Sequence, residues 1–247
     1  NEPAFLRYAW GQVKPLFETR GFARFSIAYR DAVLTALEAT GPLPAYRPGE
    51  VGLEPAAYRE LQGQLATYDV VAPRLAVLFE TMDRALHEEH VGHAFGDDYA
   101  GTAPFPSWLD RDRGRAPTLL DVEALPAELT GTVDAIRDFH GFEEGLPSVY
   151  RTMAQWPPFL ERLWADLEPR LSSEAFETAC ADAGDLVNGF VDAAPYWPRL
   201  TPDDLERVGF DEATITAVQD LFQEFNTGPV ATVLPALPAF VAAVDAT

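Results

Sequence analysis

The chain has 247 residues, enough to bury a sizeable core, and its 39 acidic residues against 18 basic ones give a formal net charge of −21. Such a charge repels nucleic acid and anionic lipid, so neither is expected as a partner. The chain contains no apolar run long enough to span a membrane, and we expect a cytoplasmic protein without a membrane partner.

Two interpretations of the acidic composition remain open. The first is an ordinary soluble protein with an acidic surface. The second is a halophilic protein, because in molar salt the Debye length shrinks to about 3 Å and the self-repulsion of the surface disappears. We favour the second, since the charge is dispersed along the chain and Lys14 is its single lysine.

Apolar residues at helical spacing predict a series of amphipathic helices in the first part of the chain. The pattern covers residues 5–17 and residues 25–37, and a Gly/Pro-rich stretch then stops it. Residues 54–68 predict a third helix. Pro73 is expected to open a fourth helix from its first turn, a position that tolerates proline.

The remainder of the chain repeats this organisation after a break. Residues 92–125 are rich in Gly, Pro and Asp and predict a linker. Helical spacing resumes over residues 129–139. Thr201 is predicted to be the N-cap of a helix with an acidic first turn, and a proline-rich apolar stretch closes the chain. No alternating strand pattern occurs between turn signals, so the predicted fold class is all-α.

An internal repeat relates the two parts of the chain. At a shift of 154 positions (157 − 3) identical residues coincide, namely Pro3/Pro157, Phe5/Phe159, Leu6/Leu160, Trp10/Trp164, Pro15/Pro169 and Phe22/Phe176. Farther on the shift becomes 157 (213 − 56), with Ala56/Ala213 and Gln62/Gln219. We therefore predict helical repeats over residues 1–91 and 126–247, joined by the linker 92–125.

The two repeats differ at their starts. The second has residues 129–154 ahead of the paired stretch, and the first has no counterpart of them. We therefore expect the first repeat to lack its N-terminal helix here, and the natural chain to begin earlier.

Few residue patterns in the chain carry chemistry. Asp69 and Asn226 occupy equivalent places in the two repeats, where they could position a water across a pseudo-two-fold axis or simply end a helix. His87, His90 and His93 do not have the spacing of a zinc hydrolase, and we expect no metal and no cofactor. A phosphate loop, a nucleophile elbow and a Cys-x-x-Cys pair are all missing from the sequence.

Both repeats begin with an aromatic-rich proline motif followed by a tryptophan, and Ser148-Val149-Tyr150 precedes Met153-Ala154-Gln155-Trp156-Pro157. In these features the chain resembles the DehI family, the group I 2-haloacid dehalogenases. The resemblance implies an all-α pseudo-dimer within one chain, similar to AhpD-like folds. It also implies hydrolysis without a cofactor, in which an aspartate activates water to displace halide from a small carboxylic acid.

The resemblance also locates a site, with substrate-binding positions at Tyr68, Ala72, Ser148, Val149 and Tyr150. The family's water-activating aspartate falls on Val149, and its supporting asparagine falls on Ala72. Neither side chain here can take up a proton. A substitute acid is therefore required, and the candidates are Asp69, Asp138 and Glu144, with Asn226 as an amide partner.

The leading functional hypothesis is a DehI-like 2-haloacid dehalogenase. The rival hypothesis is a non-catalytic helical protein that binds a small carboxylate or acts in assembly, and the sequence is compatible with a homodimer. A third class, thiol peroxidases of the AhpD-like kind, is disfavoured because Cys180 is the single cysteine.

Overall fold

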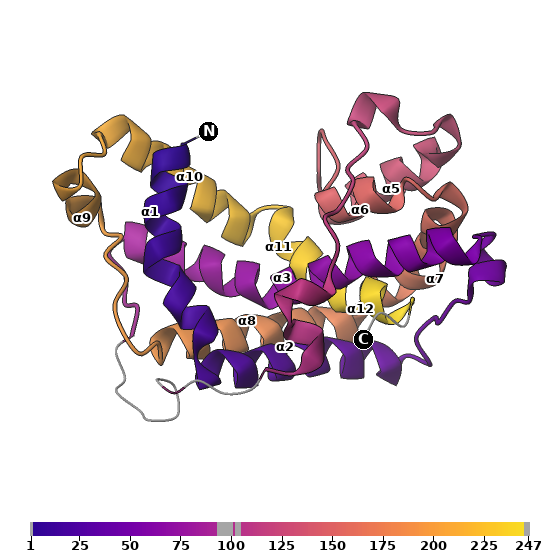
Figure 1. Cartoon of the computed structure of the whole chain (residues 1–247), viewed down its shortest axis with the longest axis horizontal. Helices are drawn as coiled ribbons and strands as arrows, with labels where there is room; N and C mark the ends of the chain where they lie inside the picture. Colours follow the sequence, from indigo (N-terminus) through magenta and orange to yellow (C-terminus); the bar gives the residue numbers. More distant parts are fainter. Residues whose placement is uncertain (1, 93–100, 102–104, 245–247) are drawn as a thin grey trace. The chain divides into compact units, whose positions relative to one another are not determined.

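The computed structural model describes residues 2–92, 101 and 105–244, and these residues form helices joined by turns, without a strand (Figure 1). The all-α prediction is confirmed. The α-helices are α1 (Pro3–Val13), α2 (Arg20–Ala39), α3 (Pro55–Leu86), α5 (Thr130–His140), α6 (Ser148–Met153), α7 (Pro157–Leu171), α8 (Glu174–Asp192), α9 (Pro202–Arg207), α10 (Glu212–Thr227), α11 (Val230–Val233) and α12 (Leu237–Ala242).

Short 3-10 helices connect them. These are η1 (Lys14–Glu18), η2 (Pro48–Val51), η3 (Ser107–Leu109), η4 (Arg111–Arg113), η5 (Val122–Ala124), η6 (Ala127–Leu129) and η7 (Leu234–Ala236). Part of the predicted linker is thus built of 3-10 turns, and another part of it lies outside the described residues.

The chain divides into two compact units, each assembled from three separate segments. Unit 1 comprises residues 1–29, 73–105 and 183–231, and unit 2 comprises residues 30–72, 106–182 and 232–247. Because these boundaries fall inside α2, α3, α8 and α11, each of the four helices contributes residues to both units.

Unit 1 has an aromatic core. Phe22 packs on Phe17 and on Phe190 of α8, with ring centroids 5.1 and 5.9 Å apart, and Phe5 of α1 packs on Phe210 and Phe222. Burial of large aromatic side chains is the main source of stability in such a core.

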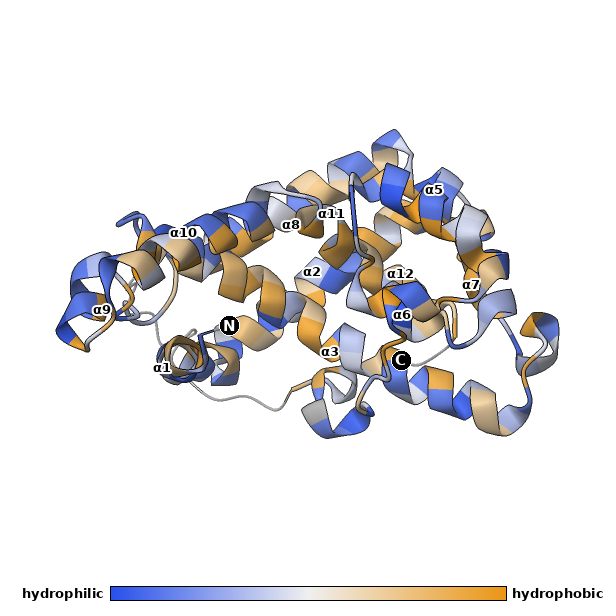
Figure 2. Ribbon diagram, turned by 90° about the horizontal axis from the view of Figure 1, so that it is seen from above, coloured by the Kyte–Doolittle hydropathy of each residue, from blue (hydrophilic) through white to orange (hydrophobic). Residues whose placement is uncertain are grey.

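Unit 2 has a second aromatic core around α7. The Trp164 ring contacts Phe139 of α5 and Tyr150 of α6, and Tyr150 also contacts Phe240 of α12. Figure 2 shows that helices such as α5 carry hydrophobic residues on one side and hydrophilic residues on the other, as the helical spacing predicts.

Helix starts follow local sequence signals. Pro3 and Pro157 lie in the first turns of α1 and α7, where a missing N–H costs little. The Thr201 side chain accepts a hydrogen bond from Asp204 N, so the predicted N-cap is confirmed.

The prediction at Pro73 was wrong. Pro73 lies inside the single helix α3 and does not open a new one. Proline removes one backbone hydrogen bond from a helix and strains the preceding turn, at a cost of about 3 kcal/mol. Buried side chains on both sides of Pro73, among them Val70, Ala72 and Val77, give the continuous helix apolar contacts that offset this cost.

The unit boundaries fall at corresponding places in the predicted repeats. The boundaries after residues 29 and 182 are 153 positions apart (182 − 29), and those after residues 72 and 231 are 159 apart (231 − 72). Both values lie close to the shifts of 154 and 157 in the sequence. In terms of the predicted repeats, unit 1 combines the two ends of the first with the middle of the second. Unit 2 combines the middle of the first with the two ends of the second. The repeats themselves and the intrachain pseudo-dimer stay predictions.

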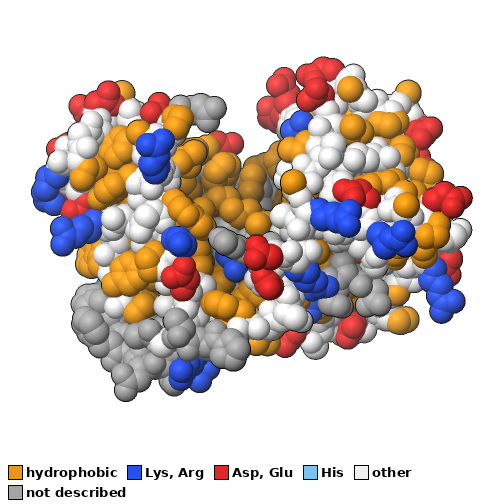
Figure 3. Space-filling view, viewed as in Figure 1, with side chains coloured by type: hydrophobic (Ala, Val, Ile, Leu, Met, Phe, Trp, Pro, Cys, Tyr) orange, Lys and Arg blue, Asp and Glu red, His pale blue; other side chains and the backbone are white. Residues whose placement is uncertain are grey.

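Charged side chains of both signs appear among uncharged ones on the face drawn in Figure 3. Among the described residues, no single helix has both the length and the apolar composition needed to cross a membrane. The segments Glu212–Thr227 and Val230–Ala242 meet that requirement only together, as a bent pair.

Two pairs of residues matched by the repeat have opposite burial. Leu160 and Trp164 of α7 are 0% and 4% exposed, and both α5 and α6 pack on α7. Their counterparts Leu6 and Trp10 of α1 are 57% and 49% exposed. Within the described residues, the same sequence motif therefore stabilises unit 2 far more than unit 1.

Truncation of the matched leucines tests this difference. Leu160→Ala should lower the free energy of unfolding by about 2–5 kcal/mol, because it removes fully buried methyl groups. Leu6→Ala should change it by no more than about 0.5 kcal/mol. Urea unfolding followed by circular dichroism measures both, and equal losses would contradict the assignment of the two environments.

Candidate functional site

Most of the predicted site residues belong to unit 2. Tyr68, Asp69 and Ala72 lie on α3, and the segment Ser148 to Tyr150 forms the first turn of α6. The structure therefore brings the two predicted groups of residues into one compact unit.

Hydrogen bonds fasten α6 to α3. The Tyr68 hydroxyl lies 2.7 Å from Thr152 Oγ1, and the amide of Gln155 donates to Gln64 Oε1 over 3.1 Å. Burial raises the pKa of Tyr68, and hydrogen bonding to Thr152 and Ser148 partly opposes that rise. Tyr68 therefore keeps its proton at neutral pH and acts as a hydrogen-bonding group.

Asp69 is the one buried carboxylate among the described residues, with 1% of its surface exposed. Its Oδ1 accepts a hydrogen bond from Arg30 Nε over 3.3 Å, whereas its Oδ2 has no hydrogen-bond partner. Burial raises the pKa of Asp69, and the positive charges of Arg30 and Arg113 work against that rise. A carboxylate with one held oxygen and one unpaired oxygen can orient and deprotonate a water.

Ala72 and Val149 occupy the positions at which the resemblance expects an asparagine and an aspartate. Both are buried, with 0% and 1% exposure. They are core residues, and they neither donate nor accept a hydrogen bond through their side chains.

Tyr150 is fully buried, and its hydroxyl lies 2.6 Å from Nε2 of His140. The other ring nitrogen of His140, Nδ1, lies 2.6 Å from Thr232 Oγ1. Burial lowers the pKa of His140 to about 4 and raises that of Tyr150 well above 10. Both groups are thus neutral at pH 7, and this hydroxyl already has a partner inside unit 2.

The sequence interpretation did not single out His140, Arg30, Arg113 or Trp108. His140 is the fourth histidine of the chain and ends α5 just before Gly141, whose φ of 80° closes the helix. The sequence signal that could have indicated His140 is its position between Phe139 and Phe142 at the end of a predicted helix. The two arginines and Trp108 join the site through contacts distant in sequence.

The other predicted residues lie elsewhere. Asp138 and Glu144 are exposed. Asn226 belongs to unit 1, where its amide donates to Glu80 Oε2 over 3.1 Å and to Asp83 Oδ2 over 2.9 Å.

The histidine cluster can be described only in part. His87 Nδ1 lies 3.0 Å from Asp83 Oδ1, and His93 lies outside the described residues. Within the described ranges no three histidine, cysteine, aspartate or glutamate side chains are grouped so that they could hold a metal ion.

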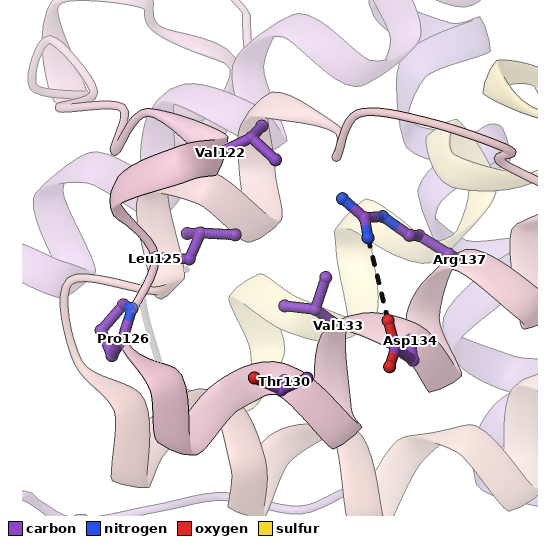
Figure 4. Close-up of a pocket in the computed structure, with 7 residues that line it drawn as sticks. All are labelled: Val122, Leu125, Pro126, Thr130, Val133, Asp134 and Arg137. Atoms are coloured by element: carbon purple, nitrogen blue, oxygen red, sulfur yellow. Dashed lines mark ion pairs between the residues drawn. The ribbon is translucent and has the colours of Figure 1, made fainter.

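A cavity of about 170 Å³ lies in unit 2 away from these residues, between the η5–η6 turns and α5 (Figure 4). Its lining is Val122, Leu125, Pro126, Thr130, Val133, Asp134 and Arg137. Arg137 Nη1 lies 3.8 Å from Asp134 Oδ1, one turn earlier on α5, and Arg137 Nε donates to the Gly145 carbonyl over 2.7 Å. None of the predicted site residues lines this cavity, so we do not place the candidate site there.

The lowered pKa of His140 gives a test of its burial. Between pH 6.5 and about 4 the folded state binds fewer protons at this residue than the unfolded state, so stability falls as the pH falls. The unfolding free energy of the wild type should therefore fall by about 3 kcal/mol between neutral pH and pH 4 because of His140. Urea unfolding of His140→Gln should show a smaller dependence on pH. Tyr150→Phe keeps the imidazole and should keep the dependence; equal slopes for wild type and His140→Gln would refute the assignment.

Comparisons with known proteins agree with this fold. The family model described as halocarboxylic acid dehydrogenase DehI matches residues 1–118. An (R)-2-haloacid dehalogenase of Pseudomonas putida is 33% identical over 86 residues, which span 34% of this chain and 29% of that relative. A configuration-inverting 2-haloacid dehalogenase of Pseudomonas sp. (strain 113) is 26% identical over 98% of this chain and 80% of its own length.

Solved structures share the fold. A D-2-haloacid dehalogenase mutant in complex with D-2-CPA aligns with a TM-score of 0.80 and 20% identity, over 98% of this chain and 82% of its own. A D-2-haloacid dehalogenase with L-LA aligns with a TM-score of 0.79 and the same identity. At this identity the likeness concerns the fold alone. The family model over residues 1–118 and the relative aligned over nearly the whole sequence both support membership of the DehI family.

Proposed function

We propose that the protein hydrolyses the carbon–halogen bond of a small 2-haloacid, with Asp69 as the base. The observation that carries this proposal is the burial of Asp69 against Arg30, with Oδ2 unpaired. Its relatives are named as haloacid dehalogenases, which supports the choice of substrate class.

The reaction balances without a cofactor. Asp69 takes a proton from water while the water oxygen forms a bond to C2, and the halide leaves with the electron pair of the broken bond. The product is a 2-hydroxy acid, and Asp69 returns its proton to solvent. A single displacement inverts the configuration at C2, so one enantiomer of the substrate gives the hydroxy acid of opposite configuration.

The electrostatics of Asp69 suit this task. General-base catalysis is most efficient when the pKa of the base lies toward the working pH, and burial moves the pKa of Asp69 in that direction. The ion pair with Arg30 opposes this rise and favours the ionised form of the carboxylate. Asp138 is a weaker candidate, because an exposed carboxylate is fully solvated.

A second candidate function is binding of a small carboxylate without turnover. It is favoured by Val149 and Ala72, which replace the aspartate and asparagine expected from the family resemblance. In this alternative Asp69 is a structural partner of Arg30.

Bromide release from each enantiomer of 2-bromopropionate, measured by ion chromatography, separates the two. We expect release by the wild type, and a loss of about 10²-fold or more in Asp69→Asn, the range for removal of a general base. Asp31→Asn removes an exposed carboxylate next to Arg30 and should retain the wild-type rate.

Three results would count against Asp69 as the base. These are full activity in Asp69→Asn, loss of activity in Asp138→Asn instead, and retention of configuration in the lactate formed. No bromide release by the folded wild type would leave the binding function as the better account.

We also infer adaptation to high salt from the net charge of −21. As KCl rises from about 0.1 M to about 1 M, the Debye length shrinks from about 10 Å to about 3 Å, and repulsion among surface carboxylates falls. The melting temperature should then rise by several degrees, as scanning calorimetry would measure. A melting temperature that stays constant or falls over this range would contradict halophilic adaptation.

The intrachain pseudo-dimer, a homodimer and a cytoplasmic location remain proposals from the sequence. The matching unit boundaries support the pseudo-dimer, because two equivalent repeats that exchange corresponding segments give boundaries at equivalent positions.

A further inference from the structure

Three buried polar atoms of unit 2 lack a hydrogen-bond partner and belong to one cluster of charged side chains. They are Arg30 Nη2, Asp69 Oδ2 and Arg113 Nη1. Arg30 is hydrogen-bonded to Asp69, and the charge of Arg113 acts on the same carboxylate. Buried donors and acceptors are almost always paired in folded proteins, so a cluster of three unpaired atoms indicates a ligand site.

The cluster has a local charge opposite to that of the whole protein. Two guanidinium groups and one carboxylate sum to +1, whereas the chain carries −21. Arg30 and Arg113 are half-buried, and a ligand with one negative charge would neutralise their excess positive charge. The two unpaired guanidinium nitrogens are donors, and a carboxylate group offers two acceptor oxygens to them.

Close packing of a surface segment on α3 holds Arg113 in the cluster. Thr67 Oγ1 donates to the Arg115 carbonyl over 2.7 Å, and Arg115 N donates to the Gly63 carbonyl over 2.8 Å. A Cβ at Gly114 would lie 2.1 Å from Thr67 Oγ1, and one at Gly63 would lie 2.7 Å from Cδ of Arg115. Glycine at both positions is what allows this approach.

The same segment fixes the orientation of Arg30. The Arg30 guanidinium carbon lies 5.1 Å from the centre of the Trp108 ring, within the range of a cation–π contact. With Nε on Asp69 and its plane against Trp108, Arg30 keeps one nitrogen, Nη2, for another partner.

We propose that Arg30 and Arg113 bind the carboxylate of a small monocarboxylic acid, through Arg30 Nη2 and Arg113 Nη1. This inference rests on the proposed function in one respect: it places C2 of a 2-haloacid beside Asp69 Oδ2. The recognition itself requires only a carboxylate, so acids without a halogen bind as well.

Calorimetry with propionate tests the proposal, because propionate has the carboxylate and no leaving group. The buffer is zwitterionic and contains neither chloride nor sulfate, so that no inorganic anion competes for the guanidinium groups. Propionate should bind to the wild type, and propionamide, which has a similar shape and no charge, should bind far more weakly. Arg113→Gln should weaken propionate binding roughly 10- to 100-fold, the range for loss of a charge-assisted hydrogen bond.

Two further variants control for charge and folding. Arg59→Gln removes an exposed positive charge from α3 and should bind propionate as the wild type does. Arg113→Lys keeps the charge and should bind more tightly than Arg113→Gln. Thermal melting of each variant verifies that the fold is retained, and for a variant that fails to fold, Arg113→Lys carries the comparison.

The outcomes separate this proposal from the proposed function. Absence of propionate binding by the wild type, equal binding of propionamide, or unchanged binding in Arg113→Gln would each overturn the carboxylate site. Binding that depends on Arg113 without any bromide release would support the site and count against the dehalogenase. Bromide release that depends on Asp69, with unchanged propionate binding in Arg113→Gln, would support the dehalogenase and count against the carboxylate site.

Discussion

The ion pair between Arg30 and Asp69 is the constraint on which the candidate site depends. A carboxylate with 1% exposure would lose most of its hydration on folding, and a partner charge is the usual way to keep it ionised. The pair joins α2 to α3 and leaves one oxygen and one nitrogen without partners. A pair with such unpaired atoms contributes little to stability and is better explained by what it can bind.

The helical framework could be read from the sequence because its signals are local. Helical spacing, the prolines at the starts of α1 and α7, and the Thr201 cap each involve residues within a few positions. The error at Pro73 shows the limit, since the break that proline favours locally is overridden by burial on both sides of it.

The candidate site was predictable in part. Asp69 could be singled out because the repeat places it opposite Asn226 in sequence, a comparison that needs no coordinates. Arg113 and Trp108 could not, since they lie in a Gly/Asp-rich stretch that reads as a linker. Their role comes from the approach of that stretch to α3 at Gly63, which only tertiary structure reveals. His140 was hidden for the same reason, because Thr232, one of its partners, is 92 positions away in sequence.

The segment exchange between the two units has a consequence for how the protein is made. Unit 1 needs residues 183–231 and unit 2 needs residues 232–247, so neither unit can be complete when only residues 1–91 have been synthesised. Contacts between distant parts of a chain slow folding, and partly built units expose apolar surface meanwhile. During synthesis the helices within residues 1–91 therefore expose core side chains until the later segments follow. Residues 1–91 contain 12 acidic and 9 basic residues, a formal net charge of only −3 (9 − 12), so charge repulsion between such incomplete chains is weak.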